Sequence, residues 1–177
     1  MGKFSREWED QILNSILFSF QNYNLRDIKE INSEKQELEF TIAVFTLCSC
    51  FIDQLSGFRY ATDRVKYRFK KFVKEYLPMY DAEELNDDLR NRLVHNYSVG
   101  SNYLLSRHEP PEFVEQTKFK VLVLDRFIDD IENAFAKYKE DLKKDPQIRS
   151  NALEWFGKYL IIGSSNHNVT ASKQALL

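Results

Sequence analysis

The chain has 177 residues, of which 43% are hydrophobic and 14% aromatic, so it can bury a core and is not a disordered segment. Its five glycines and four prolines are too few for a sheet with many tight turns, which favours long helices. The net charge of −2 excludes a protein that coats nucleic acid through a general positive excess, so any such contact must be local.

The first half of the chain is predicted to contain three helices. Apolar residues recur in each at helical spacing, and the second helix is apolar nearly all round, as expected for a helix in the middle of a core. The polar segment 24–36 is predicted to be a loop with a short turn, and Ser56-Gly57 to end the second helix. The three helices are expected over residues 5–22, 37–55 and 62–76.

The second half is predicted to be mainly helical as well. A fourth helix over 80–97 carries acidic residues in its first turns, where the helix dipole favours them. Tyr103-Leu104-Leu105 is predicted to form a short strand, and 118–124 either pairs with it in a small β-hairpin or begins a helix. Two further helices are expected over residues 121–143 and 146–162, followed by a flexible tail over 164–177.

Together these elements predict an all-α fold, a bundle of five to six helices to which one small β-hairpin can be added. Residues 1–163 are expected to form a single domain, since no linker or repeat divides them. The longest apolar run, 40–52, is too short to cross a bilayer, and the N-terminus lacks the apolar core of a signal peptide. Cys48 and Cys50 are expected to be buried free thiols. A cytoplasmic protein without membrane contact is therefore predicted.

One string concentrates the reactive side chains, Arg90-Asn91-Arg92-Leu93-Val94-His95-Asn96-Tyr97. A histidine exchanges a proton near neutral pH, and a planar guanidinium suits two-point contact with a phosphate. These groups are the minimum for attack of a ribose 2′-hydroxyl on its neighbouring phosphate, which needs no metal because the nucleophile is internal. Asn91 adds a polar orienting group, and Tyr97 a phenol that can stack on a base.

This string resembles the signature of the HEPN superfamily, Arg-x4-6-His, in the longer form Arg-x4-His-x-Tyr of HEPN toxins paired with minimal nucleotidyltransferase antitoxins. Arg90, His95 and Tyr97 match it, and Asn91 matches the polar position after the arginine. The resemblance implies a helical bundle in which two protomers bring their motifs into one cleft. It also implies that His95 is the acid/base, that Arg90 binds phosphate, and that an antitoxin can silence the RNase by nucleotidylating Tyr97.

Helix geometry leaves the choice of cation open. On an ideal helix Arg90 and His95 point about 140° apart, whereas Arg92 is the i+3 neighbour of His95. Convergence of Arg90 with His95 needs a bend near the helix end or a partner across a two-fold axis, and otherwise Arg92 takes the role. The plain alternative is that His95 caps the helix C-terminus, where the dipole favours a cation, and that both arginines are solvated surface charges.

The third predicted helix carries a second, weaker candidate for contact with RNA. Its cations are interleaved with aromatic residues, so they either form a track for RNA or are the solvated face opposite the core stripe. These cations are Arg64, Lys66, Arg68, Lys70, Lys71 and Lys74.

The acidic pairs at 87–88 and 129–130 do not predict a metal site, because neighbouring residues on a helix point apart. No metal or other cofactor is therefore expected. The sequence predicts a metal-independent endoribonuclease that acts on RNA as a homodimer in a toxin–antitoxin or antiphage role, with an antitoxin as a further partner. The alternatives are a non-catalytic HEPN-like module that binds RNA, a nucleotide or a protein partner, and a helical scaffold without a ligand.

Overall fold

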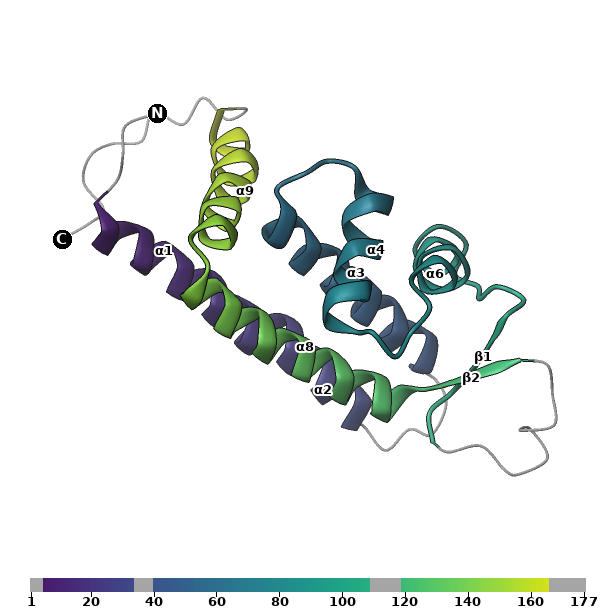
Figure 1. The fold of residues 1–177 in the computed structure, drawn as a ribbon. Coiled ribbons are helices and arrows are strands. Elements are labelled where there is room, and N and C mark those ends of the chain that lie inside the picture. Colours follow the sequence, from purple (N-terminus) through teal and green to yellow (C-terminus); the bar gives the residue numbers. More distant parts are fainter. Residues whose placement is uncertain (1–4, 34–39, 109–118, 166–177) are drawn as a thin grey trace.

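Two long helical segments lie side by side in the computed structural model, which describes residues 5–33, 40–108 and 119–165 (Figure 1). The first is a continuous helix composed of α1 (Arg6–Ser19), the π-helical turn η1 (Phe20–Leu25) and α2 (Arg26–Ser33). The second, α8 (Leu124–Lys144), runs beside it in the opposite direction, and the Lys29–Glu132 ion pair joins the two. The predicted all-α bundle with a small β element is confirmed.

The central helix is α3 (Thr41–Tyr60), which packs against α4 (Val65–Tyr76), α8 and α9 (Pro146–Ser165). Although α3 is long and apolar enough to cross a membrane, half of its most apolar window is buried inside the protein. Packing within the bundle therefore accounts for the buried half of this window. Phe51 of α3 meets Phe20 and Phe135 edge to face, with ring centroids 5.8 and 5.7 Å apart, so aromatic rings fill this part of the core.

Two predictions are wrong here, the loop predicted over 24–36 and the end of α3 predicted at Ser56-Gly57. The segment 24–36 is helical as far as Ser33, because Leu25 and Ile28 bury their side chains while the polar residues between them face outward. Gly57 does not end α3 but lies inside it. A Cβ atom there would come within 2.5 Å of the Trp155 ring, so the absence of a side chain is what lets α9 pack closely on α3.

The fourth predicted helix is confirmed, but its backbone changes type along its length. It consists of the short α5 (Ala82–Glu84), the π-helical turn η2 (Leu85–Arg90) and α6 (Asn91–Asn96). Asp81 caps its start by accepting hydrogen bonds from the backbone N–H groups of Glu83 and Glu84, both at 2.9 Å. The motif therefore begins in a π-helical turn, a feature that is frequent at functional sites.

Two short strands, β1 (Tyr103–Ser106) and β2 (Lys120–Val123), pair in parallel with Tyr103 opposite Lys120. The predicted β-hairpin is therefore wrong in its strand direction, although the small β element is present. A hairpin needs antiparallel strands and a short turn, whereas a parallel pair needs a long connection, which residues 107–119 supply. The strand β2 leads directly into α8 (Figure 1). The predicted flexible tail lies almost wholly outside the described residues.

Candidate functional site

The motif lies on the last turns of the fourth helix, beside α3 (Figure 1). The apolar edge of this helix, Leu85, Leu89 and Leu93, is fully buried and fixes the helix against the core. With that side held inward, the polar motif residues turn toward α3 and toward the surface.

Arg90 does not extend freely into solvent. Its Nη2 donates to Oδ2 of Asp53 on α3 at 2.8 Å, and its Nη1 donates to Oδ1 of Asn91 at 2.8 Å. The side chain is 15% exposed, and its Nε is buried without a hydrogen-bond partner in the described part of the chain. Asp53 and Asn91 thus fix the plane of the guanidinium while leaving some of its donors unused.

The Asp53 carboxylate binds a second arginine as well. Its Oδ1 accepts a hydrogen bond from Nη2 of Arg68 at 2.8 Å, and Arg68 also donates to the Ser56 hydroxyl and the Thr62 carbonyl. The Arg68 guanidinium lies over the Trp155 ring, 4.9 Å from its centroid. Arg68 is therefore buried in the core, not displayed with the other cations of α4. Two arginines share one carboxylate, which leaves the trio with one net positive charge.

His95 lies exposed in the last turn of α6. Its ring has no hydrogen-bond or ion-pair partner among the residues that the structure describes. The helix ends at Tyr97, whose backbone N–H bonds to the carbonyls of Arg92 and Leu93, so the His95 ring does not cap the helix by hydrogen bonding. An exposed and unbonded imidazole is accessible for proton transfer.

Two further motif residues are exposed at the end of α6. Arg92 is 51% exposed, and its Nε is 3.9 Å from the Asp88 carboxylate, a loose ion pair. Tyr97 is 61% exposed and has a φ of 50°, a left-handed conformation that costs a residue other than glycine roughly 1 kcal/mol. The described chain thus brings Arg90 together with Asn91 and Asp53, and leaves Arg92, His95 and Tyr97 at the surface.

The turn after the motif is fastened to the motif helix. The backbone N–H of Gly100 donates to the Asp88 carbonyl at 2.8 Å, and the Asn102 side chain donates to the Asp88 carboxylate. A Cβ atom on Gly100 would come within 2.2 Å of that carboxylate. Asp88 therefore orders the chain that follows the motif.

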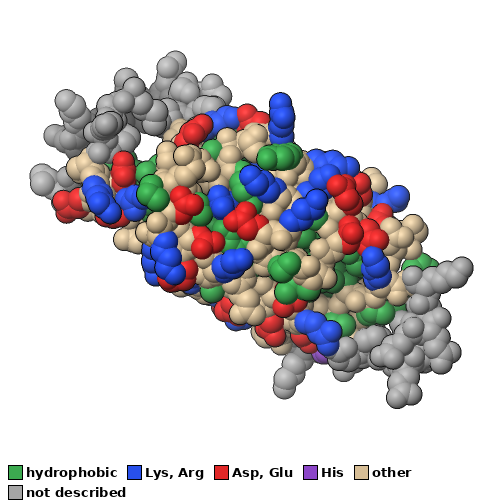
Figure 2. Space-filling model, in the orientation of Figure 1, with side chains coloured by type: hydrophobic (Ala, Val, Ile, Leu, Met, Phe, Trp, Pro, Cys, Tyr) green, Lys and Arg blue, Asp and Glu red, His purple; other side chains and the backbone are tan. Residues whose placement is uncertain are grey.

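The cations of α4 are partly neutralised by the segment that follows it. Lys66 pairs with Asp87 at 2.9 Å, and Lys70 pairs with Glu83. Lys71 lies over the Tyr60 ring. Figure 2 shows the same mixing over the face that it displays, where positive and negative side chains alternate. Exposed members of the run that have no ion pair within the described ranges are Arg64, Lys71 and Lys74.

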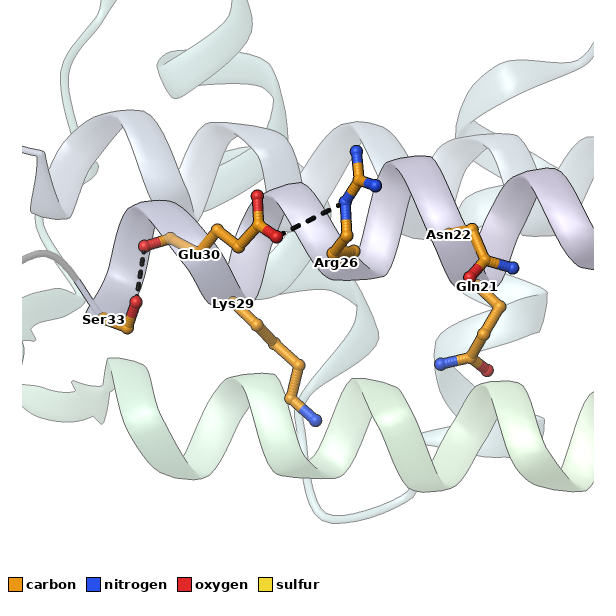
Figure 3. Close-up of a pocket in the computed structure, with 6 residues that line it drawn as sticks. All are labelled: Gln21, Asn22, Arg26, Lys29, Glu30 and Ser33. Carbon is orange, nitrogen blue, oxygen red and sulfur yellow. Dashed lines mark hydrogen bonds and ion pairs between the residues drawn. The ribbon is translucent and has the colours of Figure 1, made fainter.

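A polar pocket of about 430 Å³ lies along η1 and α2 (Figure 3). Its charged groups already have partners, because Arg26 pairs with Glu30 at 3.5 Å and Lys29 reaches Glu132 of α8 at 2.5 Å. It therefore offers little for a charged ligand. The residues that line it are Gln21, Asn22, Arg26, Lys29, Glu30 and Ser33.

In the described ranges, no three His, Cys, Asp or Glu side chains come together in a way that would hold a metal ion. Cys48 is buried, and burial raises the pKa of its thiol far above the ordinary range, so it is an unreactive core residue. Cys50 is exposed, contrary to the prediction that both thiols are buried, because it lies on the one side of α3 that other helices leave uncovered.

The residue of the candidate site that the motif did not reveal is Asp53. A signal for it exists in the sequence, because Asp53 is the one charged residue between Phe40 and Phe58, in a helix expected to be buried. A carboxylate in such a helix needs a cation to compensate it. Comparison of the chain with protein-family models, with curated proteins and with solved structures gives no match.

Proposed function

We propose that this protein is a metal-independent endoribonuclease of the HEPN type that acts in the cytoplasm, with its motif at a homodimer interface. One observation carries the proposal. An exposed imidazole, that of His95, follows an arginine whose guanidinium is held in a fixed plane by Asp53 and Asn91. A proton-transfer group near an oriented phosphate-binding group is what cleavage at a ribose 2′-hydroxyl requires.

In the proposed reaction, neutral His95 removes the proton from the 2′-hydroxyl of the substrate. The oxygen attacks the adjacent phosphorus, the bond from phosphorus to the 5′-oxygen breaks, and the products carry a 2′,3′-cyclic phosphate and a 5′-hydroxyl. A protonated imidazole gives the leaving oxygen its proton. Arg90 stabilises the negative charge that develops on the phosphate. Since no contact joins Arg90 to His95 within the described chain, the second protomer completes the site.

Arg90 is the preferred phosphate binder because it is already oriented. An arginine whose side chain is already fixed loses less conformational entropy when it binds a phosphate than a mobile arginine does. Arg92 is more exposed but loosely held, and it remains the alternative because it is the i+3 neighbour of His95 on α6.

The proposal is tested by incubating purified protein with bulk tRNA and mRNA in EDTA. We expect cleavage that survives chelation and falls at least 100-fold in His95→Ala and in Arg90→Ala. His108→Ala is the matched control, because His108 is an exposed histidine paired with Asp125 away from the motif. Loss of cleavage in Arg92→Ala with full activity in Arg90→Ala would show that Arg92, and not Arg90, binds the phosphate.

A toxin or antiphage role, with a nucleotidylating antitoxin as partner, is proposed from the family resemblance. The hydroxyl of Tyr97 is suited to such a modification, since its side chain is 61% exposed and has no partner in the part of the chain that the structure describes. The intact mass of protein purified with and without the antitoxin tests this role. An unchanged mass in both samples would remove the modification from the proposal.

A second candidate is a non-catalytic module that binds RNA, a nucleotide or a protein. The observation in its favour is that Arg90 is already engaged in an ion pair with Asp53 in the protein without a ligand. A folded and dimeric wild type that cuts no RNA, and whose mass shows no modification, would select this candidate.

A further inference from the structure

We infer that the groove between η1 and α3 binds a base of single-stranded RNA beside the motif. This inference rests on the proposed function, because it identifies what the same site would recognise in its substrate. The groove has a volume of about 340 Å³, at the lower end of the range for small-ligand sites. Its lining residues on α3 are Leu47, Cys50, Phe51 and Gln54, and those on the first helix are Tyr23, Asn24, Asp27 and Ile28.

The groove presents an aromatic ring for stacking. The Tyr23 side chain is 54% exposed, and its hydroxyl has no hydrogen-bond partner among the described residues. The ring is held by Phe18, which meets it edge to face at 6.4 Å, and by the Arg26 guanidinium, 5.8 Å from its centroid. A fixed and exposed aromatic ring next to a cation is the arrangement on which proteins stack unpaired bases.

The groove also presents polar groups that match a base edge. The Asn24 amide donates to Oε1 of Gln54 at 3.0 Å, which leaves the Asn24 Oδ1 acceptor and the Gln54 Nε2 donor unused. Asp27 accepts a hydrogen bond from Arg26 through Oδ1 at 3.1 Å, and its other oxygen remains an acceptor. Acceptors from a carboxylate and an amide favour bases with an exocyclic amino group, so adenine and cytosine should bind better than uracil.

The position of the groove links it to the motif. Cys50, which lines the groove, lies on the same side of α3 as Asp53, which holds Arg90, because residues three apart on a helix are neighbours. Cys50 lies one helical turn before Asp53. Partial burial of the Cys50 thiol and the charge of Asp53 raise its pKa, while the nearby Arg90 guanidinium lowers it. The base site and the phosphate-binding arginine thus meet on one side of α3, where adjoining nucleotides of one strand can reach both.

The inference is tested with labelled oligonucleotides that carry 2′-O-methyl groups, which lack the nucleophile and therefore bind without being cut. We expect Tyr23→Ala to raise the dissociation constant about tenfold in fluorescence anisotropy, and Tyr23→Phe to restore wild-type binding because it keeps the ring. Asp27→Asn should reduce the preference for oligo(A) and oligo(C) over oligo(U). Tyr159→Ala is the matched control, because Tyr159 is an equally exposed tyrosine on α9.

Each outcome of this experiment decides between the two proposals. Wild-type protein that binds and cuts, with Tyr23→Ala unchanged in binding, overturns the base site and leaves the nuclease standing. Binding that depends on the Tyr23 ring, without cleavage of natural RNA by protein of unmodified mass, supports the base site and overturns the nuclease. If the wild type neither binds nor cuts, both proposals fail.

Discussion

Asp53 determines the environment of two arginines at once. Its carboxylate is 19% exposed and binds Arg68 and Arg90 through different oxygens, both at 2.8 Å. Without it, Arg68 would be a buried cation with no counter-charge, and Arg90 would lose the contact that fixes its plane. Removing one partner of a buried ion pair destabilises the fold far more than replacing both partners by apolar residues, because the remaining charge stays buried without a counter-charge.

We therefore expect Asp53→Asn to lower the free energy of unfolding by about 3 kcal/mol, measured by urea denaturation. Asp87→Asn is the control, since the Asp87–Lys66 pair is exposed and should contribute less than about 1 kcal/mol. Equal effects of the two substitutions would show that Asp53 is not the essential counter-charge.

The candidate site was only partly predictable for a physical reason. The string that contains Arg90 and His95 is local in sequence, so its residue types and spacing could be recognised. The contact between Arg90 and Asp53 joins residues 37 positions apart, and no local pattern encodes which face of α3 meets the motif helix. The same holds for Arg68, which local charge patterning grouped with the other cations of its helix although its guanidinium packs on Trp155.

The ends of α3, α4 and α8 are joined by a network of hydrogen bonds around Glu75. Its carboxylate accepts from Arg59 at 2.7 Å and from the Tyr60 hydroxyl at 2.6 Å. Arg59 also donates to the Tyr76 hydroxyl, which in turn donates to Asp141 on α8. Burial raises the pKa of Glu75, but the hydrogen bonds from Tyr60 and Arg59 outweigh that effect and leave the pKa below its ordinary value.

This network predicts how stability depends on pH. A carboxylate whose pKa is lower in the folded than in the unfolded state stabilises the fold above its unfolded pKa, and that contribution is lost as the pH falls through the folded pKa. Glu75→Gln should therefore be less stable than wild type at neutral pH but lose less stability between about pH 5 and about pH 3. Urea unfolding at several pH values measures this difference, with Glu154→Gln on the exposed side of α9 as control. Parallel curves for Glu75→Gln and wild type would contradict the prediction.

The helices themselves were predictable wherever the spacing of apolar residues was regular, as in α4 and α8. The failures came from tertiary contacts that override local signals. The polar stretch after Tyr23 is helical because two buried residues, Leu25 and Ile28, suffice to anchor it. The β element was predicted in the right place, but strand direction depends on how the chain returns to the strand, which spacing alone does not specify.

In the molecule as a whole, the motif lies at one end of the helical bundle, next to the strands β1 and β2 (Figure 1). The apolar Val94 is 38% exposed there, directly before His95. In the proposed dimer, α6 of each protomer meets its symmetry mate, and the two histidines enter one cleft. An exposed apolar side chain at that position supports contact between the two copies.

We expect wild-type protein to sediment as a dimer and Val94→Glu to sediment as a monomer, because the substitution places like charges opposite each other across the two-fold axis. RNA cleavage should fall at least tenfold with it. Leu104→Glu is the control, since Leu104 is equally exposed on β1. A monomeric wild type with full cleavage activity would show that one chain suffices.

The π-helical turn Leu85–Arg90 has a consequence for how the length of the chain can vary. Its N–H groups reach back five residues, as the bond from Asn91 to the Asn86 carbonyl shows, so the turn contains one residue more than an α-helical turn. Deleting one residue between Asn86 and Leu89 would let the turn close into regular α-helix while the residues beyond keep their faces. The deletion of one residue can thus be absorbed immediately before the motif without rotating His95 away from the surface.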